Sequence, residues 1–227
     1  MKWIVNEQVL AYLERVDVMR VFADAIVFDK LPDERWTRSS SLSLMEIREI
    51  SPEPEQNSHD VSNTITTASH FLLGRVTTKQ LGSASTLLSE ITQNVIHSRS
   101  IGYAFAQAYN ANQGSRVHLG VIDIGAGIAT TLSSKYPDVA KPSDYLRLSL
   151  ESGITSSSSS NGLGLFQVRN IVQQGKGILV IRSGTALLQI HDERFYQWDD
   201  LVEIPGTQVY IAMWGSHEKG KWEYPLS

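Results

Sequence analysis

The chain has 227 residues, 41% hydrophobic and 19% charged, which is typical of a globular protein able to bury a sizeable core. A net charge of −4 without a long basic run argues against nucleic-acid binding, and the lack of cysteine excludes disulfides and thiolate metal sites. Because the sequence has neither a signal peptide nor 18 consecutive apolar residues, we expect a cytoplasmic protein that binds no membrane.

The first 60 residues predict a small α/β annex whose role the sequence does not indicate. Apolar residues between positions 9 and 16 have helical spacing, and residues 21–28 are rich in β-branched side chains. Residues 41–50 alternate polar and apolar side chains, which predicts a half-buried strand. The polar stretch 51–63, with two prolines, predicts a linker. We therefore expect two domains, 1–60 and 61–227.

The next stretch predicts a helix from about Gln80 to about His97, because Thr77 and Gln80 have the spacing of a capping box. Glu90, Asn94 and His97 are separated by four and three residues, so they share one face of that helix beside an apolar stripe. Such a row is the polar edge of an ordinary amphipathic helix or the wall of a polar site. The helix alone leaves both interpretations open.

Residues 102–109 read as a strand or as a second helical segment. Residues 117–124 predict a buried strand from their β-branched content and length. That strand ends at Asp123 and continues into a turn with Gly125 and Gly127. An acid in this position either faces a ligand at the mouth of a sheet or supports its own turn.

A short helix over 144–151 is followed by six consecutive hydroxyl residues, 155–160, which are disordered or ordered by a ligand. Gly162-Leu163-Gly164-Leu165 then opens a helix that ends at Gly175. The glycines suit either a phosphate-binding helix N-terminus or a plain loop–helix junction.

Two strands, 178–182 and 186–191, predict a hairpin, and Asp192–Asp200 predicts a polar loop. Gly206 and Thr207 precede a last alternating strand over 208–214, and the tail that follows predicts a solvated terminus.

Several common nucleotide and metal motifs are missing from the sequence. Gly175-Lys176 lacks the earlier glycine and the following hydroxyl residue of a Walker loop. Neither Gly-x-Gly pair is completed as a dinucleotide-binding fingerprint, and the histidines have no metal-ligand spacing.

The order of the remaining motifs resembles the GHKL superfamily, the Bergerat-fold ATPases that include gyrase, Hsp90, MutL and histidine kinases. Glu90 to His97 resembles the N box of that superfamily, and Asp123 to Gly127 resembles its first glycine box. Gly162 to Leu165 resembles the second glycine box, and Gly206-Thr207 the late Gly-Thr element. Within the superfamily, the chain is most similar to stand-alone bacterial histidine-kinase-like ATP-binding proteins.

The resemblance implies a two-layer α/β sandwich, with a mixed, largely antiparallel sheet covered on one face by helices. It also implies ATP and Mg²⁺ as cofactors. By the resemblance, Asp123 accepts the adenine amino group with support from Thr207, and Asn94 supplies an oxygen to Mg²⁺. Glu90 polarises the water that attacks the γ-phosphate.

The resemblance further implies that Gly162 and Gly164 hold the phosphates by their backbone amides and that Ser156–Asn161 form a lid. Gly125, Gly127, Leu163 and Leu165 are the other cofactor-binding residues that it implies. His97 is kept as a rim or structural residue.

One departure from the superfamily is that no lysine or arginine lies between Leu148 and Gly164. We therefore expect slow ATP hydrolysis that drives a conformational switch, with a protein partner or a homodimer. Two alternatives stay open: a non-catalytic, nucleotide-gated interaction module, and a protein kinase acting on a partner's serine or histidine. For the kinase, His70 is too close to Glu90 to be the usual phosphoacceptor.

Overall fold

The computed structural model describes residues 2–3, 27–28, 45, 47–111, 114–156 and 161–214. A seven-stranded sheet has the strand order β3-β4-β5-β9-β6-β7-β8. Its strands are β3 (Arg48–Ile50), β4 (Gly102–Ala111), β5 (Gly114–Asp123), β6 (Ile178–Gly184), β7 (Ala186–His191), β8 (Arg194–Trp198) and β9 (Ile204–Trp214). The helices are α3 (Pro54–Leu72), α4 (Thr78–Ser98), α5 (Ile128–Ser133), α6 (Pro142–Leu148) and α7 (Gly164–Gln174).

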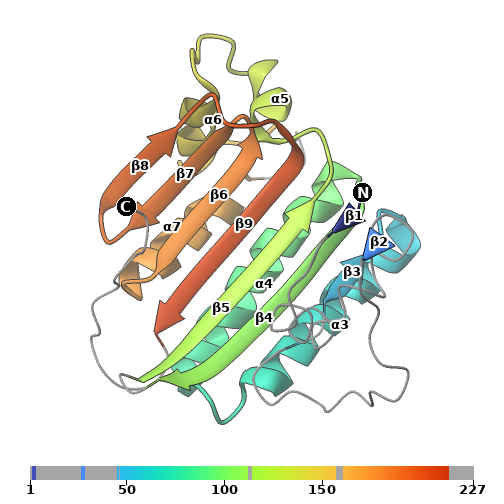
Figure 1. The fold of residues 1–227 in the computed structure, drawn as a ribbon, viewed down its shortest axis with the longest axis vertical. Coiled ribbons are helices and arrows are strands. Elements are labelled where there is room, and N and C mark those ends of the chain that lie inside the picture. The colour runs from blue at the N-terminus through green and yellow to red at the C-terminus, as the bar shows by residue number, and fades with distance from the viewer. Residues whose placement is uncertain are drawn as a thin grey trace.

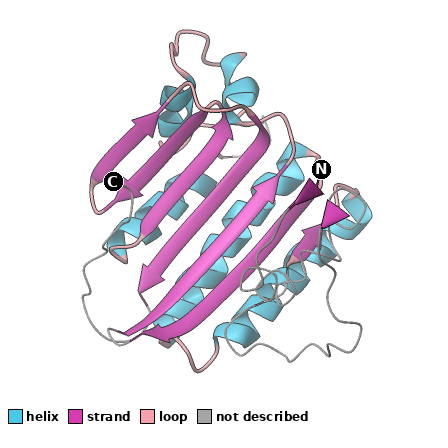
Figure 2. Ribbon diagram, in the orientation of Figure 1, coloured by secondary structure: helices cyan, strands magenta, loops and turns pink. Residues whose placement is uncertain are grey.

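The described elements form two layers. Helices α3, α4 and α7 run behind one face of the sheet, and α5 and α6 sit near the end of strands β6 to β8 (Figures 1 and 2). The apolar side chains of the helices and of the sheet face that they cover form one continuous core. The two-layer α/β sandwich expected from the sequence is therefore confirmed.

The expectation of a mixed sheet is wrong for the seven-stranded sheet, because all of its described pairings are antiparallel. The segment from β5 to β6 contains three helices, and such a crossover commonly joins parallel neighbours. Here β9 lies between β5 and β6 and pairs antiparallel with both. The parallel pairing that the structure describes joins β1 (Lys2–Trp3) and β2 (Val27–Phe28), in a separate small sheet.

Helix α4 forms as the sequence predicts. Thr77 Oγ1 accepts the N–H of Gln80 at 3.3 Å, and Gln80 Oε1 accepts the N–H of Thr77 at 2.9 Å, which completes the capping box. The helix ends where Arg99 adopts a left-handed conformation. Its buried residues form one stripe that faces the sheet, and the face with Glu90 lies beside that stripe. The buried residues are Ala84, Leu87, Leu88, Ile91, Thr92 and Val95.

Three neighbouring strands carry polar residues side by side, near one end of the helix-covered face. Successive side chains of a strand alternate between faces, so Asp123 shares the face of buried Val121 in β5. Thr207 likewise shares the face of buried Val209 in β9. The register pairs Thr207 with Asp123 on one side and with Ser183 of β6 on the other. A row of three polar side chains therefore closes one end of the core.

The linker predicted over 51–63 is wrong, because α3 occupies most of that stretch. Pro54 takes the first turn of the helix, where its missing N–H costs no hydrogen bond. The Asp60 carboxylate accepts the Ser51 N–H at 3.0 Å and secures the entry into the helix. The buried side chains that fix α3 against the core begin only at Val61, so the polar first turns looked like a linker in the sequence.

The polar loop predicted over Asp192–Asp200 is also wrong, because Arg194–Trp198 form the edge strand β8. Phe195 packs against the core, while the acids sit at the two ends of the strand. Asp199 is bound to helix α6: it accepts the Ser143 N–H at 2.8 Å and the Ser143 hydroxyl at 2.7 Å. The acid that suggested a loop therefore caps a helix far away in the sequence.

The undecided stretch 102–109 is a strand, part of β4. A strand was predicted over 41–50, and β3 covers its last three residues. Before β3, Met45 donates its N–H to Ala106 O of β4 at 2.8 Å. Residues 41–44 lie outside the described residues. The 1–60 annex lies largely outside them too, as do the solvated terminus after 214 and most of the 155–160 run. Among the helices that the structure describes, none is long and apolar enough to cross a membrane.

Candidate functional site

A pocket opens between α4, α5, the start of α7 and the polar ends of strands β5 and β9. Its empty space, including the open mouth, is about 1110 Å³. Apolar side chains supply much of its wall: Ile91, Val121, Ile128, Leu132, Ile154, Leu165 and Val209.

Asp123 is the buried acid of this pocket, with 5% of its surface exposed. Its Oδ1 accepts the Gly125 N–H at 2.8 Å. Burial raises the pKa of the Asp123 carboxyl above its ordinary value, while the backbone N–H groups of Gly125 and Thr207 oppose that rise. A carboxylate has about four positions for accepting hydrogen bonds. Asp123 can therefore support its own turn and still accept from a ligand, so the two roles left open by the sequence are compatible.

Ser183 joins the parts of the pocket that surround Asp123. Its hydroxyl donates to Gly206 O at 2.7 Å and accepts the Ile128 N–H at 3.0 Å. It also lies 3.4 Å from Thr207 Oγ1. Helix α5 begins after Gly127, which has no side chain to cap it, so a serine from β6 satisfies the first N–H of the helix. Ser183 is 2% exposed and holds the glycine turn against the sheet.

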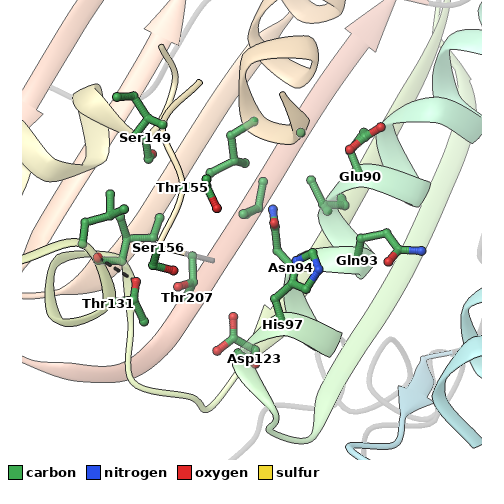
Figure 3. A pocket seen from close by; sticks show the side chains of 18 of the residues that line it. Glu90, Gln93, Asn94, His97, Asp123, Thr131, Ser149, Thr155, Ser156 and Thr207 are labelled. Atoms are coloured by element: carbon green, nitrogen blue, oxygen red, sulfur yellow. Dashed lines mark hydrogen bonds between the residues drawn. The ribbon is translucent and has the colours of Figure 1, made fainter. Parts of the chain in front are cut away.

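The opposite wall is the polar face of α4. Glu90, Asn94 and His97 all line the pocket, as the helical spacing predicts, and Gln93 joins them (Figure 3). Glu90 and Asn94 are half-buried, whereas His97 is exposed at the mouth. This face of α4 therefore forms one wall of the pocket, with His97 at its rim, as the interpretation of a polar site requires.

The start of α7 lies against the Glu90 carboxylate of α4. A Cβ added at Gly164 would lie 2.9 Å from Glu90 Oε2, so glycine lets the carboxylate and the helix N-terminus approach each other closely. The N-cap residue, Leu163, offers no side-chain acceptor to the first N–H groups of α7. Gly164 and Leu165 line the pocket at this point, and the helix dipole there favours an anion.

The two ends of the segment before α7 are joined at its base. Gly153 donates its N–H to Gly162 O at 3.0 Å. Gly162 has φ +64°, and a Cβ there would lie 2.6 Å from the Gly153 carbonyl carbon, so glycine is required at this crossing. Ile154, Thr155 and Ser156 line the pocket just above it. Of the Ser156–Asn161 lid, residues 157–160 lie outside the described part of the chain.

The charges of the pocket are unbalanced. Glu90 and Asp123 contribute carboxylates, and the described residues that line the pocket include no lysine or arginine. Within the described part of the chain, no group of three His, Cys, Asp or Glu side chains could hold a metal ion. A cation bound here would therefore need ligands from the bound molecule or from water in addition to those of the protein.

The structure gathers most of the residues singled out in the sequence. Eight of them line the pocket together with His97: Glu90, Asn94, Asp123, Gly127, Gly162, Gly164, Leu165 and Thr207. Gly125 and Leu163 are not among the lining residues; Gly125 supports Asp123 from behind, and the Leu163 side chain is 39% exposed. Sequence reasoning missed Ser183, because it lies between the two strands predicted for the hairpin, 178–182 and 186–191. Its spacing from buried Ile181 was the signal that it faces the core.

No protein-family model matches this chain, and no curated protein matches it either. The case for a function therefore depends on the pocket and on the residues that form it.

Proposed function

We propose that the chain is a Mg²⁺-dependent ATP-binding protein of the Bergerat type, with slow ATP hydrolysis that drives a conformational switch. The observation that carries the proposal is the convergence of four separate sequence motifs on one pocket. Residues from the α4 face, the Asp123 turn, the Gly162–Leu165 stretch and Thr207 all line it. The chemistry of these residues divides the pocket into a base end and a phosphate end.

Asp123 and Thr207 form the base end. Asp123 accepts a hydrogen bond from the adenine amino group, and Thr207, directly opposite in the register, supports it directly or through water. The aliphatic side chains of Val121, Val209 and Leu132 provide the apolar contact that a purine ring needs. Since Asp123 is held by backbone N–H groups, this end is organised before a ligand arrives.

Gly162, Gly164 and the first turn of α7 form the phosphate end. Backbone N–H groups without a side-chain cap donate to phosphate oxygens, and the positive end of the helix dipole favours the negative charge. Glycine permits the chain to approach the phosphates closely. Thr155 and Ser156 line the pocket at this end, and we place the lid, Ser156–Asn161, over it.

The residues present suit a magnesium ion. Asn94 is half-buried and lines the pocket one helical turn from Glu90, so a neutral amide oxygen and a carboxylate face the phosphate end together. Mg²⁺ prefers oxygen ligands and commonly takes only one or two from protein, with phosphate and water completing its coordination. Asn94 would hold the ion, which when bound offsets phosphate charge.

Glu90 is the general base of the proposed hydrolysis. Its carboxylate accepts a proton from the water that attacks the γ-phosphorus, while the bond between that phosphorus and the bridging oxygen breaks and ADP leaves. We expect slow turnover because no cationic side chain lines the pocket among the described residues. The same observation favours a second candidate, a module that binds the nucleotide without hydrolysing it and thereby orders a surface for a protein partner.

Titration with ATP and ADP, each with and without Mg²⁺, tests the binding proposal by calorimetry. We expect Mg-ATP to bind and the affinity to fall when Mg²⁺ is withheld; a chain that binds neither nucleotide would refute the proposal. Incubation with γ-labelled ATP then separates the functions. Released phosphate indicates an ATPase, label on a partner protein indicates a kinase, and binding without either indicates the interaction module.

A further inference from the structure

The proposed function places a negatively charged ligand beside the carboxylates of the pocket. A nucleoside triphosphate carries several negative charges, and the pocket adds the carboxylates of Glu90 and Asp123. Like charges at short distance repel each other strongly where water is partly excluded. A cationic side chain near the phosphate end would relieve this repulsion.

Lys135 contacts a residue that lines this pocket. It follows α5, four residues after Thr131, which lines the pocket. The Lys135 Nζ atom donates to the Thr155 carbonyl oxygen at 2.9 Å. Thr155 itself lines the pocket on the side facing α4 (Figure 3). The ammonium group is therefore bound to the backbone of a residue that lines the cavity, directly before the proposed lid.

No carboxylate among the described residues neutralises the positive charge of Lys135. An ammonium group has three N–H donors, and the Thr155 carbonyl takes one of them. Its other described contact is with the ring of Tyr136, whose centroid lies 5.7 Å from Nζ. Neither partner is a carboxylate, so within the described part of the chain the charge is not neutralised. Arg169, another basic residue, is instead paired with Glu151 at 3.0 Å.

We propose that Lys135 is the cation that this pocket uses for a polyphosphate ligand, with the Thr155 carbonyl positioning its ammonium group. The inference rests on the proposed nucleotide site and adds a residue that lies outside all four motifs. Lysine suits this role because a compact ammonium group on a flexible stem can contact phosphate as a point charge. Its exposed position also means that its replacement leaves the core intact.

The test compares ATP with adenosine, which shares the base and has no phosphate. Lys135→Met should lower the affinity for Mg-ATP about tenfold, the effect of losing one charge-assisted contact, and leave adenosine binding unchanged. The affinity of Lys135→Met for Mg-ATP should also depend less on salt than that of the wild type. Lys135→Arg keeps the charge and should bind Mg-ATP nearly as well as the wild type.

Lys141→Met is the matched control, since Lys141 is an exposed lysine nearby that does not line the pocket. It should bind both ligands like the wild type. An unchanged affinity of Lys135→Met for Mg-ATP would overturn the inference, and so would an equal loss in the two Met variants. An equal fall for ATP and adenosine would assign Lys135 to positioning alone and overturn it too. A wild-type chain that binds neither ligand would refute the nucleotide site itself.

Discussion

Gly206 offers a sharp test of how the base end is built. A Cβ at residue 206 would lie 2.0 Å from the Asp123 carbonyl oxygen and 2.7 Å from Ile124 Cα. Alanine at this position therefore forces the segment at Gly206 and the end of β5 apart by at least about 1 Å. Gly184 is a matched control. It has a similar positive φ, +58° against +70°, but nothing lies within 4 Å of its Cβ position.

Gly184→Ala should cost only the conformational penalty of a left-handed alanine, about 1–2 kcal/mol in the free energy of unfolding. Gly206→Ala should cost about 1–3 kcal/mol more, because overpacking is added to that penalty. Urea denaturation with an unchanged m value measures both. Calorimetry should show that Gly206→Ala also loses nucleotide affinity, since Asp123 is displaced, while Gly184→Ala keeps it. Equal destabilisation of the two variants would refute the close approach of Gly206 to Asp123.

Four other predictions concern the acids and the lid. Asp123→Asn should abolish adenine nucleotide binding, because the acceptor becomes partly a donor; undiminished affinity in calorimetry would contradict the assignment of the base end. Burial raises the pKa of Asp123, so its contribution to stability is lost as pH rises from the ordinary value of 3.8 through the raised pKa. The unliganded Asn variant should therefore resist urea better than wild type at pH 7 and lose this advantage in acid. Glu90→Ala should retain Mg-ATP but lose phosphate release, and wild-type turnover in the variant would remove Glu90 as the base. Proteolysis between residues 133 and 160 should slow when Mg-ATP is added, and equal cutting with and without nucleotide would argue against a lid.

The elements that the sequence predicted correctly are those whose signals are local. The capping box at Thr77 and the apolar spacing that follows it act within a few turns of one helix, so α4 could be predicted closely. The hairpin of β6 and β7 has its two strands next to each other in the chain. Glu90, Asn94 and His97 share a face because helical geometry alone dictates it.

The errors occurred where a distant contact decides the structure. The polar start of α3 becomes a helix because Val61 and later residues pack on the core. The strand β8 forms because it adds to β7, and Asp199 is occupied by Ser143 of α6 rather than by solvent. Composition suggested a linker and a loop, because polar residues at helix ends and on edge strands resemble those of loops.

The sequence by itself determined the local setting of the candidate residues: an acid and an amide on one helix face, an acid before a glycine turn, and glycines before a helix. Only the tertiary structure decided that these residues meet. The insertion of β9 between β5 and β6 sets the register that aligns Asp123, Thr207 and Ser183. The approach of Thr155 to the end of α5 lets its carbonyl accept a hydrogen bond from Lys135. Periodicity and capping depend on neighbours a few residues away, whereas strand order and register depend on packing between segments that the sequence keeps far apart.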